Sequence, residues 1–279
     1  MLKYELIPEQ LIREGVLSPE QIFRPGMLED EEALLVHTAQ YLNDMQALQL
    51  DPAMVRRIGF PLNRALADRE RNIAKGTVSC AEHALQHGAA LNVAGGTHHA
   101  FADAGEGFCL LNDMALAAAT LLKQKIARKI LILDLDVHQG NGTARIFENE
   151  PAVFTFSMHG QNNYPLKKEK SRLDAGLPDG TDDRAYLRLL DFHMKQIADA
   201  FEPDFVFFQA GVDILDTDRL GRLKVSKKGC AERDRMVFSF CYQNKIPVVA
   251  VMGGGYSPLI KDITDSHCET FRQAMHFFG

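Results

Sequence analysis

The sequence places three potential metal ligands at alternate positions. Asp134, Asp136 and His138 lie in the stretch 132–142, where an apolar run leads into polar residues. Alternate residues of a strand point to the same face, so these side chains would gather at the strand's carboxyl end, where open α/β sheets bind ligands. Acids and an imidazole suit divalent cations, and crowding two carboxylates without a cation is unfavourable. The pattern therefore favours a metal site over a strand that simply ends in solvent.

Polar residues follow three other apolar runs in the same manner. Each lies just past a short run that predicts a strand: Asp213 after 205–210, His98 and His99 after 91–94, and Tyr256 after 247–252 and three glycines. An acid after a strand is often only a turn former. Here Asp213 can supply the third metal ligand, and we interpret the four strand ends as one reaction centre.

The chain resembles the histone deacetylase family over most of its length. Five segments carry the resemblance in the family's order: Gly95–Ala100, Gly107–Asp113, Asp134–Gly142, Gln209–Asp213 with Asp218–Gly221, and Gly253–Tyr256. The short length and the segment Met158–Pro165 are most similar to small class IV and bacterial members. Such a resemblance does not by itself make histones the substrate.

The resemblance implies a role for each matching residue. It assigns the metal ligands to Asp136, His138 and Asp213, the catalytic histidine pair to His98 and His99, the acid that orients His98 to Asp134, and the carbonyl-polarising hydroxyl to Tyr256. Three protein ligands leave open positions on Zn2+, with Fe2+ as the alternative, for water and a carbonyl oxygen. An imidazole can move the proton and a phenol can stabilise the oxyanion.

The partner of the second histidine departs from the best-known deacetylases. They carry an aspartate where this chain has Asn141, although other branches of the family also carry asparagine there. A neutral amide can fix the tautomer of His99 without stabilising its imidazolium form. We therefore expect His99 to be neutral at rest and ready to act as a base.

Two further groups of residues are implied only by the resemblance. Gly107 and Phe108 match the substrate channel, with the glycine carbonyl receiving the substrate amide and the ring forming a wall; a tight turn with Phe108 in the core is the alternative. A monovalent cation site, for K+, matches five positions: Asp134, Asp136, His138, Ser157 and Met158. Such a cation would offset the clustered carboxylate charge.

The surrounding sequence predicts an α/β fold. Strands are expected near 91–94, 130–135, 152–157, 205–210 and 247–252, alternating with helices near 31–49, 61–87, 112–125, 183–201, 227–244 and 258–277. This alternation favours a mainly parallel sheet with helices on both faces. We therefore predict a three-layer, arginase/deacetylase-like fold in a single catalytic domain over residues 1–279.

Two segments do not fit this alternation. Residues 160–180 have no periodic pattern and several charges, so we expect a long loop at the rim of the pocket, with a solvated excursion as the alternative. Family members usually begin with a strand, whereas Met1–Tyr4 leads almost directly into Ile7–Arg13. We expect that N-terminal strand to be missing, together with any groups it contributes; a native start farther upstream would explain this.

The composition of the chain limits the binding partners, the cysteine chemistry and the cellular compartment that we expect. A net charge of −6 and a pI near 5.9 argue against direct nucleic-acid binding and suit a cationic product such as lysine or a polyamine. The five cysteines include no CxxC pair, which disfavours disulfides and a thiolate zinc site. Without a signal-type start or an apolar run of spanning length, we expect a cytoplasmic protein with no membrane partner.

These features predict a metal-dependent amidohydrolase that removes an acetyl or longer acyl group from lysine, in a peptide or protein, or from a polyamine. Two alternatives stay open: a two-manganese amidinohydrolase of the arginase type and a non-catalytic protein that binds acyl ligands. The first usually needs further acids beside the histidine ligand, where this chain has Gln139 and Asn141.

Overall fold

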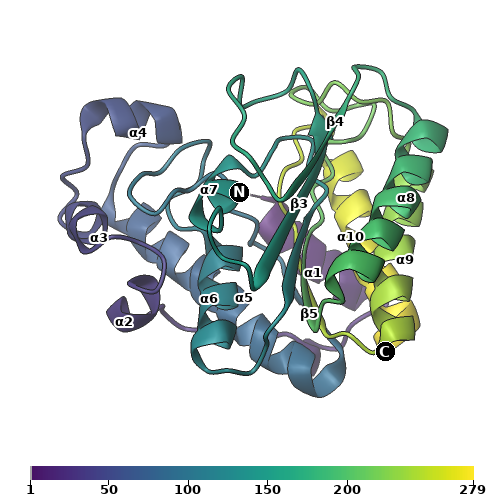
Figure 1. Ribbon diagram of the computed structural model, residues 1–279, viewed down its shortest axis with the longest axis horizontal. Coiled ribbons are helices and arrows are strands. Elements are labelled where there is room, and N and C mark those ends of the chain that lie inside the picture. The colour runs from purple at the N-terminus through teal and green to yellow at the C-terminus, as the bar shows by residue number, and fades with distance from the viewer. Residues whose placement is uncertain (1) are drawn as a thin grey trace.

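A six-stranded parallel sheet forms the centre of the molecule. The computed structural model describes residues 2–279, and the strands lie in the order β1-β6-β5-β2-β3-β4 (Figure 1). Their bounds are β1 Ala89–Asn92, β2 Ile130–Asp134, β3 Val153–Gly160, β4 Leu173–Leu177, β5 Phe205–Gln209 and β6 Val248–Val251. Every pair of neighbours is parallel. The predicted fold class is thus confirmed.

The strand register brings the carboxyl ends of the central strands to one level. Asp134 at the end of β2 lies opposite Gln209 on β5, and Gln209 lies opposite Val251 on β6. β2, β5 and β6 are buried along their whole length because helices cover both faces of the sheet. The loops that follow these strands therefore leave the sheet side by side.

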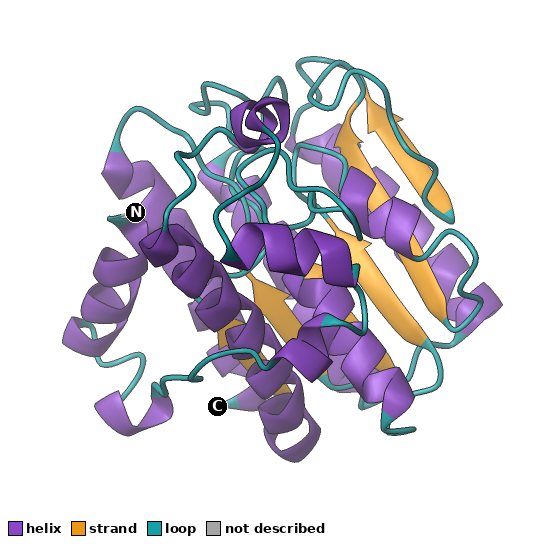
Figure 2. Ribbon diagram, turned by 90° about the vertical axis from the view of Figure 1, so that its left-hand side faces the viewer, coloured by secondary structure: helices purple, strands orange, loops and turns teal. Residues whose placement is uncertain are grey.

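Helices cover both faces of the sheet, as Figure 2 shows. Their bounds are α1 Lys3–Arg13, α2 Asp30–Ala33, α3 Ala39–Gln46, α4 Pro52–Ile58, α5 Arg64–His87, α6 Asp113–Lys123, α7 Asn141–Ile146, α8 Asp183–Phe201, α9 Lys227–Asn244 and α10 Ile260–Phe278. Side chains of α5 and α6 form one core with alternate strand residues such as Ile132 and Phe207. Those of α8 and α9 form the other with Leu133 and Phe208.

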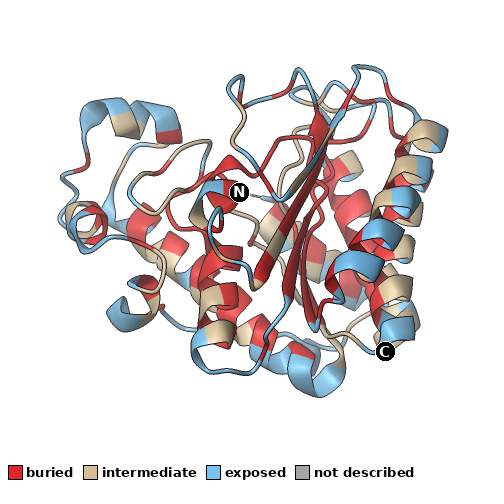
Figure 3. Cartoon of the chain, in the orientation of Figure 1, coloured by how far each residue is buried: buried red, intermediate tan, exposed pale blue. Residues whose placement is uncertain are grey.

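The degree to which residues are buried agrees with this three-layer arrangement. The central strands are buried throughout, whereas the outer faces of the helices are exposed (Figure 3). The five cysteines are all buried and free. Within residues 2–279, no helix combines the length and the apolar character needed to cross a membrane.

The structure differs from the predicted elements at two segments and has two short helices, α4 and α7, that were not predicted. The helix expected over 31–49 is divided into α2 and α3, separated by a turn at Leu34–His37. The segment 160–180 contains β4, whose burial alternates because it is an edge strand with one face half exposed. A short strand in which Asp174 and Gly176 interrupt the apolar residues lacks the continuous apolar run on which the sequence prediction depended.

The N-terminal residues form a helix. Residues 3–13 form helix α1, which packs on α10 with Ile7 and Leu11 completely buried against Phe271. Among the described residues no strand lies beyond β1 at that edge of the sheet. The amphipathic spacing of Ile7 and Leu11, one helical turn apart, was the signal for this helix.

Candidate active site

Three buried side chains converge where the central strands end. Asp136 and His138 lie in the loop after β2 and Asp213 lies in the loop after β5, with one ligand atom of each within 4.8 Å of the others. The Nδ1 atom of His138 is 3.1 Å from Asp136 Oδ1 and 3.1 Å from Asp213 Oδ2. Two buried carboxylates that face a single imidazole nitrogen fit the donor set of a divalent metal.

Backbone amides hold both carboxylates in this position. Asp136 accepts from the amides of His138 and Gly254, each at 2.9 Å, and Asp213 accepts from the amide of Val137 at 2.9 Å. A Cβ atom at Gly254 would overlap the Asp213 carboxylate. The glycine is therefore needed for the loop after β6 to approach the acids so closely.

The electrostatics of the cluster show the cost of burying these charges together. Burial, followed by the charge of Asp136, raises the pKa of Asp213 to about 7. Burial lowers the pKa of His138, but the hydrogen-bonded carboxylates outweigh this and raise it to about 10. Both effects are expected where like charges are crowded in a site that suits a cation.

Two adjacent histidines lie beside the cluster, each with a different partner. His98 Nδ1 is 2.7 Å from Asp134 Oδ2, and His99 Nδ1 is 2.7 Å from Asn141 Oδ1. Burial lowers the pKa of His98, but Asp134 and then Asp136 raise it to about 9. The pKa of His99 falls well below its ordinary value because of burial and the charges of His98 and His138. His99 is therefore the neutral member of the pair.

Gly107 and Phe108 form a turn at the entrance. Both have positive φ, +57° and +69°, and a Cβ at residue 107 would lie 2.6 Å from the His99 ring. The Phe108 side chain is 38 % exposed, so it is not a core residue, which disfavours the alternative of a tight turn with a buried ring. Its ring lies 6.2 Å from that of Tyr256 across the opening.

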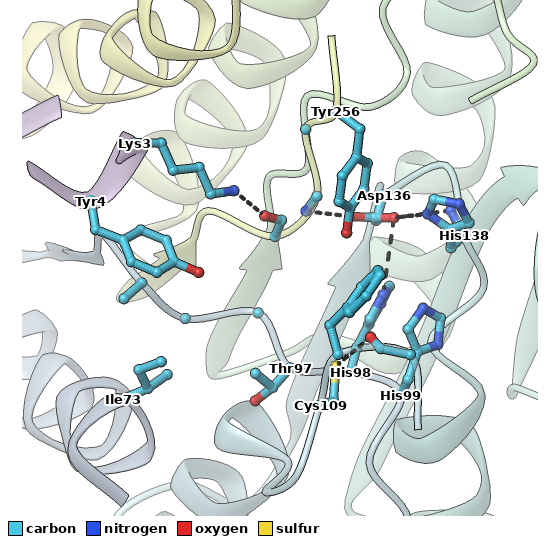
Figure 4. A pocket seen from close by; sticks show the side chains of 18 of the residues that line it. Lys3, Tyr4, Ile73, Thr97, His98, His99, Cys109, Asp136, His138 and Tyr256 are labelled. Carbon is cyan, nitrogen blue, oxygen red and sulfur yellow. Dashed lines mark hydrogen bonds and ion pairs between the residues drawn. The ribbon is translucent and has the colours of Figure 1, made fainter. Parts of the chain in front are cut away.

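Tyr256 comes from the loop after β6 and points into the cavity (Figure 4). Its ring lies 6.3 Å from that of His138. Burial, followed by the charge of Asp213, raises the pKa of Tyr256 well above its ordinary value. The phenol is thus a hydrogen-bond donor at neutral pH and stands beside the proposed metal ligands.

A cavity of about 340 Å³ joins these groups. It runs from Phe108 and Tyr256, past His98, His99 and the metal-ligand candidates, to the start of α1 (Figure 4). At this inner end, Lys3 donates from Nζ to the carbonyl of Gly253 at 2.7 Å, and burial lowers its pKa to about 8. The N-terminal helix therefore contributes a group to the site.

The residues expected at a monovalent cation site lie close together. Ser157 on β3 is paired in register with Asp134 on β2, and both are buried, as is Met158. The Ser157 hydroxyl is 2.9 Å from Nδ1 of His159. Asp134 also accepts from the amide of Asp136 at 3.2 Å, so it links this region to the metal-ligand cluster.

The sequence analysis missed three residues at the site. Lys3 was not selected because a lysine near a chain start has no local signature. Glu106 and Tyr164, joined by a hydrogen bond of 2.8 Å, lie beside Asn141 and His99. The unusual Glu106 between two glycines was the available signal for one of them.

The chain is similar to known proteins in sequence and in structure. Residues 2–272 match the profile of the histone deacetylase domain. An uncharacterized protein of Picosynechococcus is 44 % identical over 98 % of this chain and 91 % of its own length. Histone deacetylase 2 of Arabidopsis thaliana is 32 % identical over 91 % of this chain and 68 % of its own length.

Solved structures show the same fold. The crystal structure of a histone deacetylase homologue from Aquifex aeolicus superimposes with a TM-score of 0.83 at 22 % identity, covering 98 % of this chain and 77 % of that one. The complex of such a homologue with SAHA gives the same TM-score, identity and coverage. The chain thus shares its overall fold with these structures.

Proposed function

This chain belongs to the histone deacetylase family, and we propose that it is a metal-dependent amidohydrolase that removes an acyl group from the amine of lysine or a polyamine. One observation carries the proposal: Asp136 and His138 line the same cavity as His99 and Tyr256, and Asp213 completes their cluster. This arrangement combines a metal site, a base and an oxyanion donor, which amide hydrolysis requires.

Asp136, His138 and Asp213 would hold the divalent ion, Zn2+ or Fe2+. When bound, the ion would polarise the amide carbonyl and lower the pKa of water. A set of three protein ligands would leave positions open on the ion for the carbonyl oxygen and water. We also propose K+ at Asp134, Ser157, Met158 and the carbonyls of Asp136 and His138, where it would offset the carboxylate charge.

His99 is the proposed general base. Its Nδ1 is engaged by Asn141, which leaves Nε2 to take a proton from the attacking water and return it to the departing amine. A histidine with a depressed pKa is unprotonated at neutral pH and available for this step. His98, paired with a carboxylate, would instead remain cationic and stabilise negative charge.

Tyr256 is the proposed oxyanion donor. Its hydroxyl stays protonated at neutral pH because burial and Asp213 raise its pKa. Three glycines precede it, and Gly253 has a φ of +59° that favours glycine. A donor aimed at the developing oxyanion stabilises the transition state more than the ground state.

The entrance is suited to a slender, uncharged chain. Phe108 and Tyr256 stand on opposite sides, and the Gly107 carbonyl can receive an amide N–H. An acyl-lysine side chain, or an acylated polyamine arm, is a methylene chain that ends in an amide. The cavity continues past the metal-ligand candidates, so acyl groups longer than acetyl remain within the proposal.

The two-metal amidinohydrolase is disfavoured by side-chain contacts. Among residues 2–279, the grouping of acids, histidines and cysteines that fits a metal contains only the three named ligands. Gln139 donates to Asp174 and to the Glu169 carbonyl, and Asn141 faces His99. Neither residue turns toward the cluster to complete a second metal site.

A substrate screen tests the proposal. Zn2+- and Fe2+-loaded protein would be incubated with acetyl-lysine peptides, acetylpolyamines and longer acyl-lysines, and the released amine measured. Metal-loaded Tyr256→Phe is the matched control. We expect turnover of at least one class in the parent and a large loss in the variant. Binding of these compounds without any release would instead support a non-catalytic acyl-binding protein.

A further inference from the structure

Glu106 accepts two hydrogen bonds beside the proposed base. Its Oε1 atom receives the Asn141 side-chain amide at 2.6 Å and the Tyr164 hydroxyl at 2.8 Å. Asn141 in turn presents its Oδ1 to His99 Nδ1 at 2.7 Å. A carboxylate, an amide, and an imidazole therefore form one continuous chain of hydrogen bonds that leads from the rim to the cavity.

The chemical types fix the direction of this chain. A carboxylate can only accept, so the Asn141 group that faces Glu106 must be the NH2 group, and the group that faces His99 must be the carbonyl oxygen. That oxygen can only accept, so Nδ1 of His99 must carry the proton. Nε2 is then free of a proton, which is the form a general base needs.

The surroundings hold this chain in place. Asn141 is buried at the start of α7. The residues that follow Glu106 are anchored to the end of α4, because the amide of Gly107 donates to the Arg57 carbonyl and that of Phe108 to the Ile58 carbonyl. The Tyr164 ring meets the His99 ring edge-on, with centroids 5.2 Å apart.

We propose that Glu106 is a positioning residue for the reaction. Through Asn141 it selects the Nδ1-protonated tautomer of His99, and its carboxylate supplies a negative charge that is separated from the imidazole only by the Asn141 amide. The two histidines then differ in how they are supported, since His98 contacts the Asp134 carboxylate directly. The inference rests on the proposed function, because His99 is its base. It also extends the expectation that the neutral amide of Asn141 fixes the tautomer of His99.

The first test replaces the carboxylate by an amide of the same shape. In Glu106→Gln, both amides can flip together, so the direction of the chain is no longer imposed. We expect kcat to fall about 10-fold, the effect of losing one charge-assisted hydrogen bond, with little change in KM. Asp103→Asn is the matched control, since it removes the same charge from an exposed position on the same loop.

A second readout does not depend on turnover. ¹⁵N NMR of Zn2+-loaded protein labelled at histidine reports which ring nitrogen carries the proton, and His99→Asn identifies the resonances. We expect Nδ1–H for His99 in the parent and in Asp103→Asn, and a mixture of tautomers in Glu106→Gln. An unchanged His99 tautomer together with parental kcat in Glu106→Gln would overturn the proposal.

A third test compares Asn141→Asp alone with the double variant that also carries Glu106→Gln. Asn141→Asp alone would place two carboxylates in contact at a separation like the present 2.6 Å, so we expect lower kcat than in Glu106→Gln. When Glu106→Gln is added, the glutamine amide can donate a hydrogen bond to the new aspartate, which then contacts His99 directly. We therefore expect the kcat of the double variant to be about 10-fold higher than that of Asn141→Asp alone.

The proposal and the function on which it rests fail in different ways. A parent protein that hydrolyses none of the acyl substrates contradicts the proposed function, whatever the NMR shows. An active parent in which the Asn141→Asp variant is not rescued by Glu106→Gln contradicts the role of Glu106 alone. An effect of Glu106→Gln on KM without any on kcat would also contradict it, because it would make Glu106 a substrate contact.

Discussion

The strand-end cluster and the rim of the cavity are built in opposite ways. In the cluster, Asp134, Asp136 and Asp213 are at most 3 % exposed and accept hydrogen bonds from backbone amides. At the rim, the side chains of Phe108 and Tyr164 are 38 % and 41 % exposed and belong to loops. Buried loops directly after the strand ends thus form one region, and more exposed loops form the other.

The two regions are suited to different roles, namely chemistry in the cluster and substrate selection at the rim. Groups that perform chemistry need fixed positions, which the register of parallel strands and the buried amides provide. Groups that select the substrate can lie on loops, where a change of side chain leaves the core intact. We therefore expect cluster variants, and variants of residues hydrogen-bonded to the proposed base, to change kcat or metal content, and variants of the entrance wall at Phe108 to change KM.

The largest effect on turnover is expected at the proposed base. His99→Ala removes the proton carrier and should lower kcat by about 100-fold to 10,000-fold. His98→Ala should cost less, because His98 is expected to act through its charge. Steady-state kinetics of the two variants at equal metal content makes the comparison. A larger loss in His98→Ala would reverse the two assignments.

The next effect concerns Tyr256, which lies between the two regions. Tyr256→Phe preserves the ring and removes the hydroxyl, so kcat should fall by about 100-fold to 1,000-fold, as when one oxyanion donor is lost. Metal content and thermal stability should match the parent. Near-parental turnover would mean that the tyrosine is a packing residue.

A smaller effect is expected at the rim. Phe108→Ala removes one wall of the entrance, which should raise KM about 10-fold through lost apolar contact and leave kcat nearly unchanged. The folded protein should lose little stability, because the ring is partly exposed. If kcat fell and KM stayed constant, the division between chemical cluster and selective rim would be wrong.

The last prediction concerns the contribution of the buried His37 to stability. His37 is buried and its Nε2 accepts from the Asn112 amide, and burial lowers its pKa to about 4 from an ordinary value near 6.5. Its neutral form is therefore favoured on folding, and this contribution is lost as pH falls from about 6.5 to 4. Relative to His37→Gln, the parent should lose about 3 kcal/mol over that range. Urea unfolding of both proteins at several pH values measures this difference, and equal slopes would contradict it.

The sequence was most informative where a strand leads directly into functional residues. Asp134 and Asp136 stand in strand phase, and Asp213 follows another central strand, so parallel pairing was enough to predict that they meet. The same logic predicted the fold class. Local spacing sufficed in these cases because the sheet itself determines the tertiary arrangement.

The groups that escaped prediction depend on contacts between distant segments. Lys3 reaches Gly253 across 250 residues of chain, and Glu106 reaches Asn141 from a loop without regular structure. Edge strand β4 was missed because Asp174 and Gly176, at its exposed positions, interrupt the apolar run. No local pattern encodes such contacts, since helix docking and loop conformation create them.

Metal stoichiometry tests the central claim most directly. Purified protein would be stripped of metal, titrated with Zn2+ or Fe2+, and assayed for bound metal and for acyl-amide hydrolysis in the same samples, beside Asp213→Ala. We expect one divalent ion per chain, activity that rises in proportion to it, and neither in the variant. Two ions per chain at full activity, or full activity in metal-free protein, would contradict a single-metal site at Asp136, His138 and Asp213.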